Sequence, residues 1–232
     1  MGGLFYYGFD SLYLYLVVLA IIIALWSQIK VKTTFSKYSA YRTDISGADA
    51  ARKVLEASGV YGVKIERVSG NLTDHYDPKS KVIRLSDSSY SSTSAAAVGV
   101  AAHEAGHAVQ HATEYAPMRL RSAIIPITNI GSRLTLPLIL LGFLLSFQPL
   151  VTIGIAAFAL STVFQLVTLP VEFDASKRAM NALRSSGRMQ QDELTASRKV
   201  LTAAAMTYVA ALAVSLMQLL RFILIFGRRS RN

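Results

Sequence analysis

The sequence has no cysteine and few charged residues. Of its 232 residues, 52% are hydrophobic and 16% are charged, against about 25% charged residues in ordinary soluble proteins. The absence of cysteine excludes disulfides and thiolate metal sites, so any metal must be bound by His, Asp or Glu. Histidine is also scarce, and three of the 4 histidines lie close together, at His103, His107 and His111. This composition argues against a disordered chain and against a purely soluble one.

The net charge of +10 does not by itself indicate a nucleic-acid-binding protein. Basic residues such as Lys30, Lys32 and Arg133 flank hydrophobic segments, and flanking charge of this kind is typical of membrane proteins. No RNA-binding or zinc-finger pattern accompanies the charge. We therefore expect the lipid bilayer, and no nucleic acid, as a partner.

The first apolar segment covers residues 12–25. Together with residues 4–9 it is long enough to cross a bilayer, which takes about 20 residues. A cleavable signal peptide has a basic start and a small-residue cleavage site, whereas here the basic residues Lys30 and Lys32 follow the segment. Residues 1–29 are therefore predicted to be an uncleaved transmembrane anchor, with the N-terminus outside and residue 30 onward in the cytoplasm.

A second apolar segment, residues 134–170, is interrupted by Gln148-Pro149. It is too long for a single crossing of about 20 residues, so residues 124–171 are predicted to form a transmembrane helical hairpin with both ends in the cytoplasm. The last segment, residues 201–232, is hydrophobic with a basic tail, and it contains Gln218 and Arg221. If it crosses, its tail lies outside against the positive-inside tendency, so the sequence leaves its crossing open.

Residues 30–123 have the signals of a small α+β region. Ser46 is typical of an N-cap and predicts a helix over residues 48–57. Residues 63–68 and 81–85 alternate apolar and polar side chains, and turn signals, including one at residues 76–78, lie between them. The sequence therefore predicts a short antiparallel sheet. A Ser/Thr-rich stretch then precedes an Ala-rich helix that is predicted to reach about Ala112.

The Ala-rich helix carries His103-Glu104-Ala105-Gly106-His107. Residues four apart lie on one face of a helix, so His103 and His107 can bind one zinc ion at about 2.0–2.1 Å. Glu104 lies beside the metal and can serve as general base toward the attacking water. The pattern also arises by chance, but its place on a helix after a strand favours a metal site. The predicted fold class is a mainly α-helical integral membrane protein with a small zincin-like α+β catalytic region.

A catalytic zinc site needs a third protein ligand. The metzincin extension would require Gly and His where this chain has Gln110 and Thr113, so that class is excluded. Topology favours Glu172, because a hairpin of two crossings returns it to the side of the membrane where the histidines lie. The candidates are His75, His111, Glu114, Glu172 and Asp174.

The motif and the later Glu172-Phe173-Asp174-Ala175 resemble the gluzincin membrane peptidases. Most of the chain, including residues 74–78, is similar to the YugP-type membrane zinc metallopeptidases, with HtpX-type proteases as more distant relatives. The resemblance implies His103 and His107 as zinc ligands, Glu104 as catalytic base, and Glu172, in residues 172–200, as third ligand of one zinc per chain. HtpX-type proteins have Asp four residues after the ligand Glu, where this chain has Ser176. Asp174 is therefore a candidate for orienting a ligand imidazole.

These observations predict a multi-pass zinc endopeptidase of the bacterial cell membrane with its active site facing the cytoplasm. A protein or peptide substrate is expected to pair with the exposed edge of the strand at residues 81–85. His75 and Tyr76 are candidate donors to the oxyanion, or belong only to a tight turn. The alternatives are a catalytically silent membrane adaptor with a structural metal site, and a transporter, which the few ionisable residues in the spans argue against. Membrane-protein partners or a homo-oligomer are further candidates.

Overall fold

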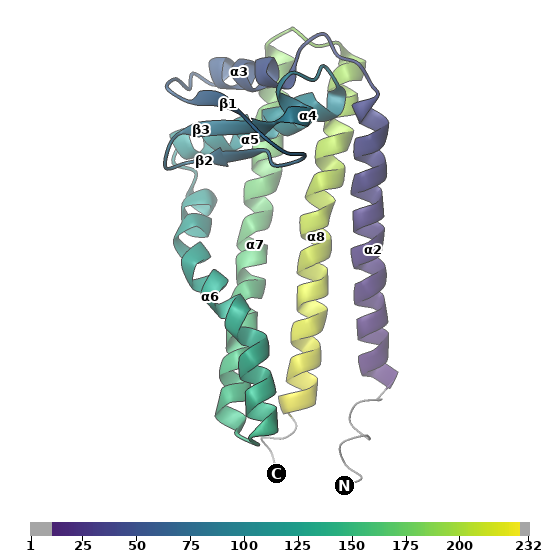
Figure 1. Ribbon diagram of the computed structural model, residues 1–232, viewed down its shortest axis with the longest axis vertical. Helices are drawn as coiled ribbons and strands as arrows, with labels where there is room; N and C mark the ends of the chain where they lie inside the picture. The colour runs from purple at the N-terminus through teal and green to yellow at the C-terminus, as the bar shows by residue number, and fades with distance from the viewer. Residues whose placement is uncertain (1–10, 228–232) are drawn as a thin grey trace. The chain divides into compact units, whose positions relative to one another are not determined.

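The computed structural model describes residues 11–227, which are mainly helical. Within these residues, four helices are long and apolar enough to cross a membrane by length and composition. They are α2 (Ser11–Ser39), α6 (Ala116–Leu144), α7 (Gln148–Ser185) and α8 (Gln191–Gly227) (Figure 1). The predicted mainly helical class is confirmed. The apolar residues 4–9 of the expected anchor and the basic tail after residue 227 lie outside the described residues.

The described chain divides into two compact units. The apolar unit comprises residues 11–28, 120–168 and 207–227, and the polar unit comprises Ile29–Arg119 and Leu169–Met206. Each of the four long helices continues from one unit into the other.

Close helix packing organises the apolar unit. α6 and α7 follow one another along the chain, which turns at residues 145–147, immediately before Gln148-Pro149. Gly154 on α7 lies against α6, since a Cβ at this glycine would meet the Thr135 carbonyl oxygen at 3.1 Å. A hydrogen bond of 2.8 Å between the Thr162 and Ser215 hydroxyls joins α7 to α8. Small and hydroxyl-bearing residues at helix contacts are typical of membrane helix bundles.

The polar unit contains a three-stranded sheet with helices around it. Its elements begin with α3 (Gly47–Ala57), which has the expected N-cap, since the Ser46 hydroxyl accepts a hydrogen bond from Asp49 N. The remaining elements are β1 (Lys64–Val68), β2 (His75–Asp77), β3 (Val82–Ser86), α4 (Asp87–Tyr90) and α5 (Ala95–Ala112). The Ala-rich helix thus ends at the predicted residue.

The sheet is mixed, so the expected antiparallel sheet was wrong. Its order is β1-β3-β2, with β1 parallel and β2 antiparallel to β3 (Figure 1). Alternating side chains indicate strands but not their partners, and residues 75–77, which overlap the turn expected at residues 76–78, form the third strand. Because β3 is paired on both sides, the expectation that a substrate pairs with the edge of residues 81–85 was also wrong.

The core of the polar unit lies between α3, α5 and the central strand. Val54 of α3, Val98 of α5, and Ile83 and Leu85 of β3 are fully buried in one cluster. Burial of such side chains contributes about 1.5–3 kcal/mol each. The helix that bears the histidine motif is therefore fixed against the sheet by hydrophobic packing.

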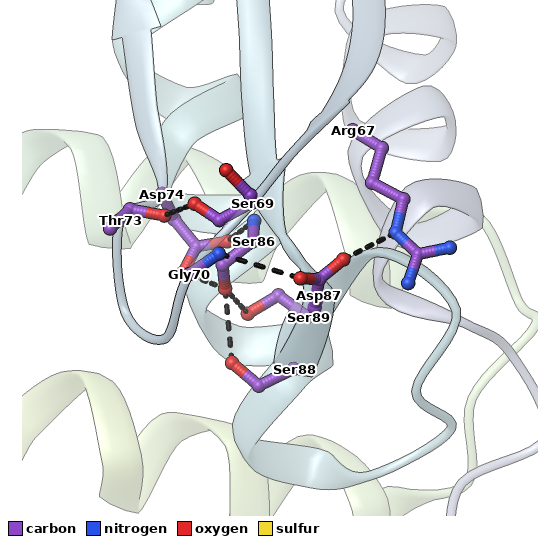
Figure 2. A network of polar contacts seen from close by, with 9 residues as sticks. All are labelled: Arg67, Ser69, Gly70, Thr73, Asp74, Ser86, Asp87, Ser88 and Ser89. Atoms are coloured by element: carbon purple, nitrogen blue, oxygen red, sulfur yellow. Dashed lines mark hydrogen bonds and ion pairs between the residues drawn. The ribbon is translucent and has the colours of Figure 1, made fainter.

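A polar network fixes the end of β3 beside the loop that leads to β2 (Figure 2). The Asp74 carboxylate accepts hydrogen bonds from the backbone N–H of Ser86 at 2.8 Å and from its hydroxyl at 2.9 Å. The Asp87 carboxylate accepts hydrogen bonds from the Arg67 guanidinium and from Gly70 N. Since Asp74 immediately precedes β2, these bonds help to fix where that strand starts.

Candidate metal centre

α5 is fixed at its start and is lined with small residues. The Ser94 hydroxyl accepts a hydrogen bond from Ala97 N at 3.2 Å, which satisfies one of the free N–H groups of the first turn. Ala101, Ala102 and Ala105 are fully buried. Short side chains on this helix allow neighbouring elements to approach its backbone closely.

The closest approach is at Gly106, within the histidine motif. A Cβ atom at this position would lie only 2.3 Å from the carbonyl oxygen of Ala175 on α7, so only glycine fits. Ala175 follows Glu172 by three residues on the same helix. The glycine of the motif therefore permits the contact that brings Glu172 to the histidines.

His103, His107 and Glu172 form a compact group of three donor atoms within 4.8 Å of one another. Glu172 Oε2 lies 3.1 Å from His103 Nε2 and 3.6 Å from His107 Nε2. The Glu172 carboxylate is buried, with 2% of the side chain exposed. Two imidazoles and one carboxylate are the donor set of many catalytic zinc sites, so the residues present fit zinc.

The far side of each imidazole has a hydrogen-bond partner. His103 Nδ1 lies 3.0 Å from the Ser176 hydroxyl, and His107 Nδ1 lies 3.0 Å from Gln110 Oε1. Both Nδ1 atoms are therefore occupied, and both Nε2 atoms face Glu172. Partners of this kind hold ligand imidazoles in place in metalloproteins.

The negative charges around His107 affect its protonation. Burial lowers the pKa of His107, but the nearby carboxylates of Glu172 and Glu104 outweigh burial and raise this pKa above its ordinary value. The site thus stabilises positive charge at the imidazole. The same negative charges favour a metal cation beside Nε2 of His107.

Glu104 lies outside the cluster of three and is held by the sheet. Its carboxylate accepts a hydrogen bond of 2.9 Å from the backbone N–H of Tyr76 on β2. Tyr76 also reaches α5 through its side chain, with its hydroxyl 2.8 Å from His111 Nδ1. Burial and then the charge of Asp77 raise the pKa of Tyr76, so its hydroxyl is protonated at neutral pH and can donate to His111. β2 is thus attached to the motif helix at two points.

The other candidate residues lie at different places. His75 is exposed and its Nδ1 contacts the Thr73 carbonyl oxygen at 2.8 Å. His111 contacts Tyr76 and is outside the three-residue group.

Glu114 is exposed beside Arg119. Asp174 contacts neither ligand histidine directly in any hydrogen bond of the described residues, but accepts one from Gln110 Nε2 at 2.9 Å.

Sequence reasoning missed the roles of Gly106, Gln110 and Ser176 around the cluster. Gln110 follows His107 by three residues, and Ser176 follows Glu172 by four, so both lie one turn from a cluster residue. That spacing was the available signal. It could not show which imidazole either side chain would meet.

A family model described as "Putative neutral zinc metallopeptidase" matches residues 13–227. The chain belongs to this family. A relative from Bacillus subtilis (strain 168), named "Putative membrane protease YugP", is 45% identical over 217 residues, which cover 93% of this chain and 96% of the relative. No solved structure gives a significant match.

Membership of the zinc metallopeptidase family confirms the resemblance inferred from the motifs. The family name denotes hydrolysis of peptide bonds with zinc. The cluster of His103, His107 and Glu172 fits such a metal, and the four long apolar helices accord with the relative's description as a membrane protease.

Proposed function

We propose that this protein is a membrane-embedded zinc endopeptidase in which His103, His107 and Glu172 hold one zinc ion. The observation that carries the proposal is the convergence of these three donors, from two helices, within 4.8 Å. Bound zinc would supply a Lewis acid that acidifies water and polarises the scissile carbonyl. Two imidazoles and one buried carboxylate would leave a coordination position of a bound zinc free for water, which a structural site with four protein ligands would not.

Glu104 is proposed as the general base that takes the proton from the attacking water and passes it to the leaving amine. It follows His103 directly, yet its carboxylate is outside the group of three donors. The Tyr76 N–H fixes the direction of that carboxylate at 2.9 Å. An oriented carboxylate that is not itself a ligand is what proton transfer beside the metal requires.

The peptide substrate is proposed to pair with β2 rather than with β3. Within the described residues, β2 is an edge strand that pairs with β3 on one side only. Its Tyr76 N–H is directed to Glu104. A strand added at this edge would gain backbone hydrogen bonds and would run beside the proposed base. His75 and Tyr76 stay candidate oxyanion donors, and Asp174 stays a candidate for orienting a ligand imidazole.

The proposed location is the bacterial cell membrane, with several crossings and the active site facing the cytoplasm. Large apolar side chains on the long helices are more than half exposed, including Ile22, Leu136, Ile153 and Leu216. Apolar surface of this extent is costly in water and favourable in lipid. The proposed organisation is an anchor at residues 1–29, a catalytic region at 30–123, a hairpin at 124–171, the third-ligand helix at 172–200 and a C-terminal segment at 201–232.

The test uses the full-length protein in detergent, with bound zinc and cleavage of an unstructured protein substrate as measurements. Glu104→Gln is expected to keep zinc and to lose about 10²–10⁴-fold in cleavage rate. Glu172→Ala is expected to lose zinc and cleavage together. Glu114→Gln, a matched exposed change near the end of the same helix, serves as control and is expected to keep both.

Two results would contradict the proposal. Cleavage at the wild-type rate by Glu104→Gln would remove Glu104 as the base. Wild-type protein that binds one zinc but cleaves no peptide bond would favour the adaptor with a structural metal site.

A further inference from the structure

Gln110 is a fully buried polar side chain between the two helices of the cluster. Its Oε1 lies 3.0 Å from His107 Nδ1, and its Nε2 lies 2.8 Å from the carbonyl oxygen of Val171 and 2.9 Å from Asp174 Oδ2. Val171 and Asp174 lie on either side of Glu172 along α7. One side chain of α5 therefore contacts a proposed ligand of its own helix and both flanks of the ligand from the other helix.

The direction of the Gln110 amide is determined by its partners. The Val171 carbonyl and the Asp174 carboxylate only accept hydrogen bonds, so they must face the amide NH₂ group. The oxygen must then face His107, and it can only accept. It follows that Nδ1 of His107 carries a proton, so the lone pair of the neutral imidazole lies on Nε2, the atom 3.6 Å from Glu172 Oε2.

Asp174, which accepts a hydrogen bond from the Gln110 amide, is itself held in place. The Arg178 guanidinium donates to Asp174 Oδ2 at 2.6 Å and to the Thr113 hydroxyl at 3.3 Å. The same guanidinium lies over the Tyr115 ring at 5.3 Å. Asp174 therefore has a fixed acceptor for Gln110, and rotation of the amide would break bonds at both of its ends.

His103 is held differently. Its Nδ1 partner is the Ser176 hydroxyl, which rotates and can either donate or accept. A hydroxyl is therefore compatible with both tautomers of His103, whereas the oriented amide is compatible with one neutral tautomer of His107. The Gln110 amide therefore constrains the tautomer of His107, whereas the Ser176 hydroxyl does not constrain that of His103.

We propose that Gln110 is a positioning residue that fixes His107 in its metal-binding tautomer and ties α5 to α7 on both sides of Glu172, with Asp174 and Arg178 holding the amide in place. This inference rests on the proposed function, because it concerns the same three ligands. It assigns to Asp174 an indirect role through Gln110.

The first test is zinc affinity of the full-length protein in detergent, measured by competition with a zinc chelator. Gln110→Met keeps the side-chain length and removes every hydrogen bond, and is expected to weaken zinc binding about 10–100-fold. Ser176→Ala is expected to weaken it less. Ser197→Ala is the control, since the Ser197 hydroxyl is buried in the same unit and has no hydrogen-bond partner among the described residues. It should leave the affinity unchanged.

The second test separates hydrogen bonding from packing and applies even if Gln110→Met does not fold. Gln110→Glu places a carboxylate against Asp174 and should weaken zinc binding strongly, because like charges meet and the donors are lost. Adding Asp174→Asn exchanges the amide and the carboxylate at constant net charge. The new amide can donate to the new carboxylate, which still accepts from His107, so the double variant should bind zinc at least about tenfold more tightly than Gln110→Glu, about 1.4 kcal/mol.

The measured zinc affinities test the proposed function and the role of Gln110 separately. Wild-type protein that binds no zinc would overturn the proposed function as well as this inference. Zinc binding by wild type together with an affinity of Gln110→Met within threefold of wild type would overturn the inference alone. A double variant that binds no more tightly than Gln110→Glu would overturn it as well, since packing without directed hydrogen bonds predicts no recovery.

Discussion

The two units of this protein use buried polar groups in opposite ways. In the polar unit such groups join segments that are far apart in sequence, as when Gln110 contacts Val171 and Asp174. In the apolar unit most buried hydroxyls bond to their own helix, as when Thr128 and Thr135 donate to carbonyl oxygens four residues earlier. The polar unit thus obtains specific tertiary contacts from hydrogen bonds. The apolar unit depends on close packing of small residues, which is the usual basis of helix association in lipid.

Two glycines, Gly106 in the polar unit and Gly131 in the apolar unit, give the largest expected contrast. Gly106→Ala in the polar unit would place a Cβ 2.3 Å from the Ala175 backbone oxygen, whereas Gly131→Ala in the apolar unit would meet nothing closer than 3.6 Å. We expect Gly106→Ala to lower the free energy of unfolding by at least about 2 kcal/mol, since the backbone of α7 must move. Zinc affinity should fall with it. Gly131→Ala should be neutral or stabilising by up to about 1 kcal/mol.

Unfolding of both glycine variants in a denaturing detergent, with zinc content measured in parallel, checks this difference. Equal effects of the two substitutions would mean that the close approach at Gly106 does not set the position of Glu172.

A buried carboxylate at the start of α8 gives the next largest effect. Glu193 is 5% exposed and accepts hydrogen bonds from Asp44 N at 2.9 Å and from Gln190 N at 2.6 Å. Glu193→Ala removes both hydrogen bonds. Because hydrogen bonds to charged groups contribute about 1.5–3 kcal/mol, we expect the free energy of unfolding to fall by about 2 kcal/mol. Glu193→Gln keeps one acceptor, and its free energy of unfolding should fall by about half as much. Thermal unfolding is the measurement, and an unchanged midpoint in Glu193→Ala would refute the role of this carboxylate.

The smallest effect is expected in the apolar unit. Thr162→Val removes the hydrogen bond to Ser215 between α7 and α8. Hydrogen bonds between membrane helices average about 0.6 kcal/mol. Thr162→Val should therefore lower the free energy of unfolding by less than Glu193→Ala does. Thr152→Val is the matched control on the same helix, because the Thr152 hydroxyl donates to the Gln148 carbonyl oxygen of its own turn. A loss above about 2 kcal/mol for Thr162→Val, measured in the same detergent series, would remove the contrast between the units.

Local features were predictable from the sequence. The Ser46 cap, the helix that follows it and the end of α5 at Ala112 agree with the structure, because capping and periodicity depend on residues within one or two turns. The mixed order of the sheet was not predictable in the same way. Alternation in residues 64–68 and 82–86 is compatible with either strand direction, and β2 has three residues, too few to show a pattern.

The candidate site divides along the same line. Four-residue spacing on a helix determined that His103 and His107 share a face, so local spacing accounts for two of the three residues of the cluster. The motifs in the sequence also carried the family resemblance. The arrival of Glu172 beside them, the contact of β2 with Glu104 and the direction of the Gln110 amide were decided by tertiary structure. These depend on two backbones meeting at Gly106 and Ala175 and on donors finding acceptors 61 and 64 residues away. Such pairings are set by packing of the folded chain, which no local spacing records.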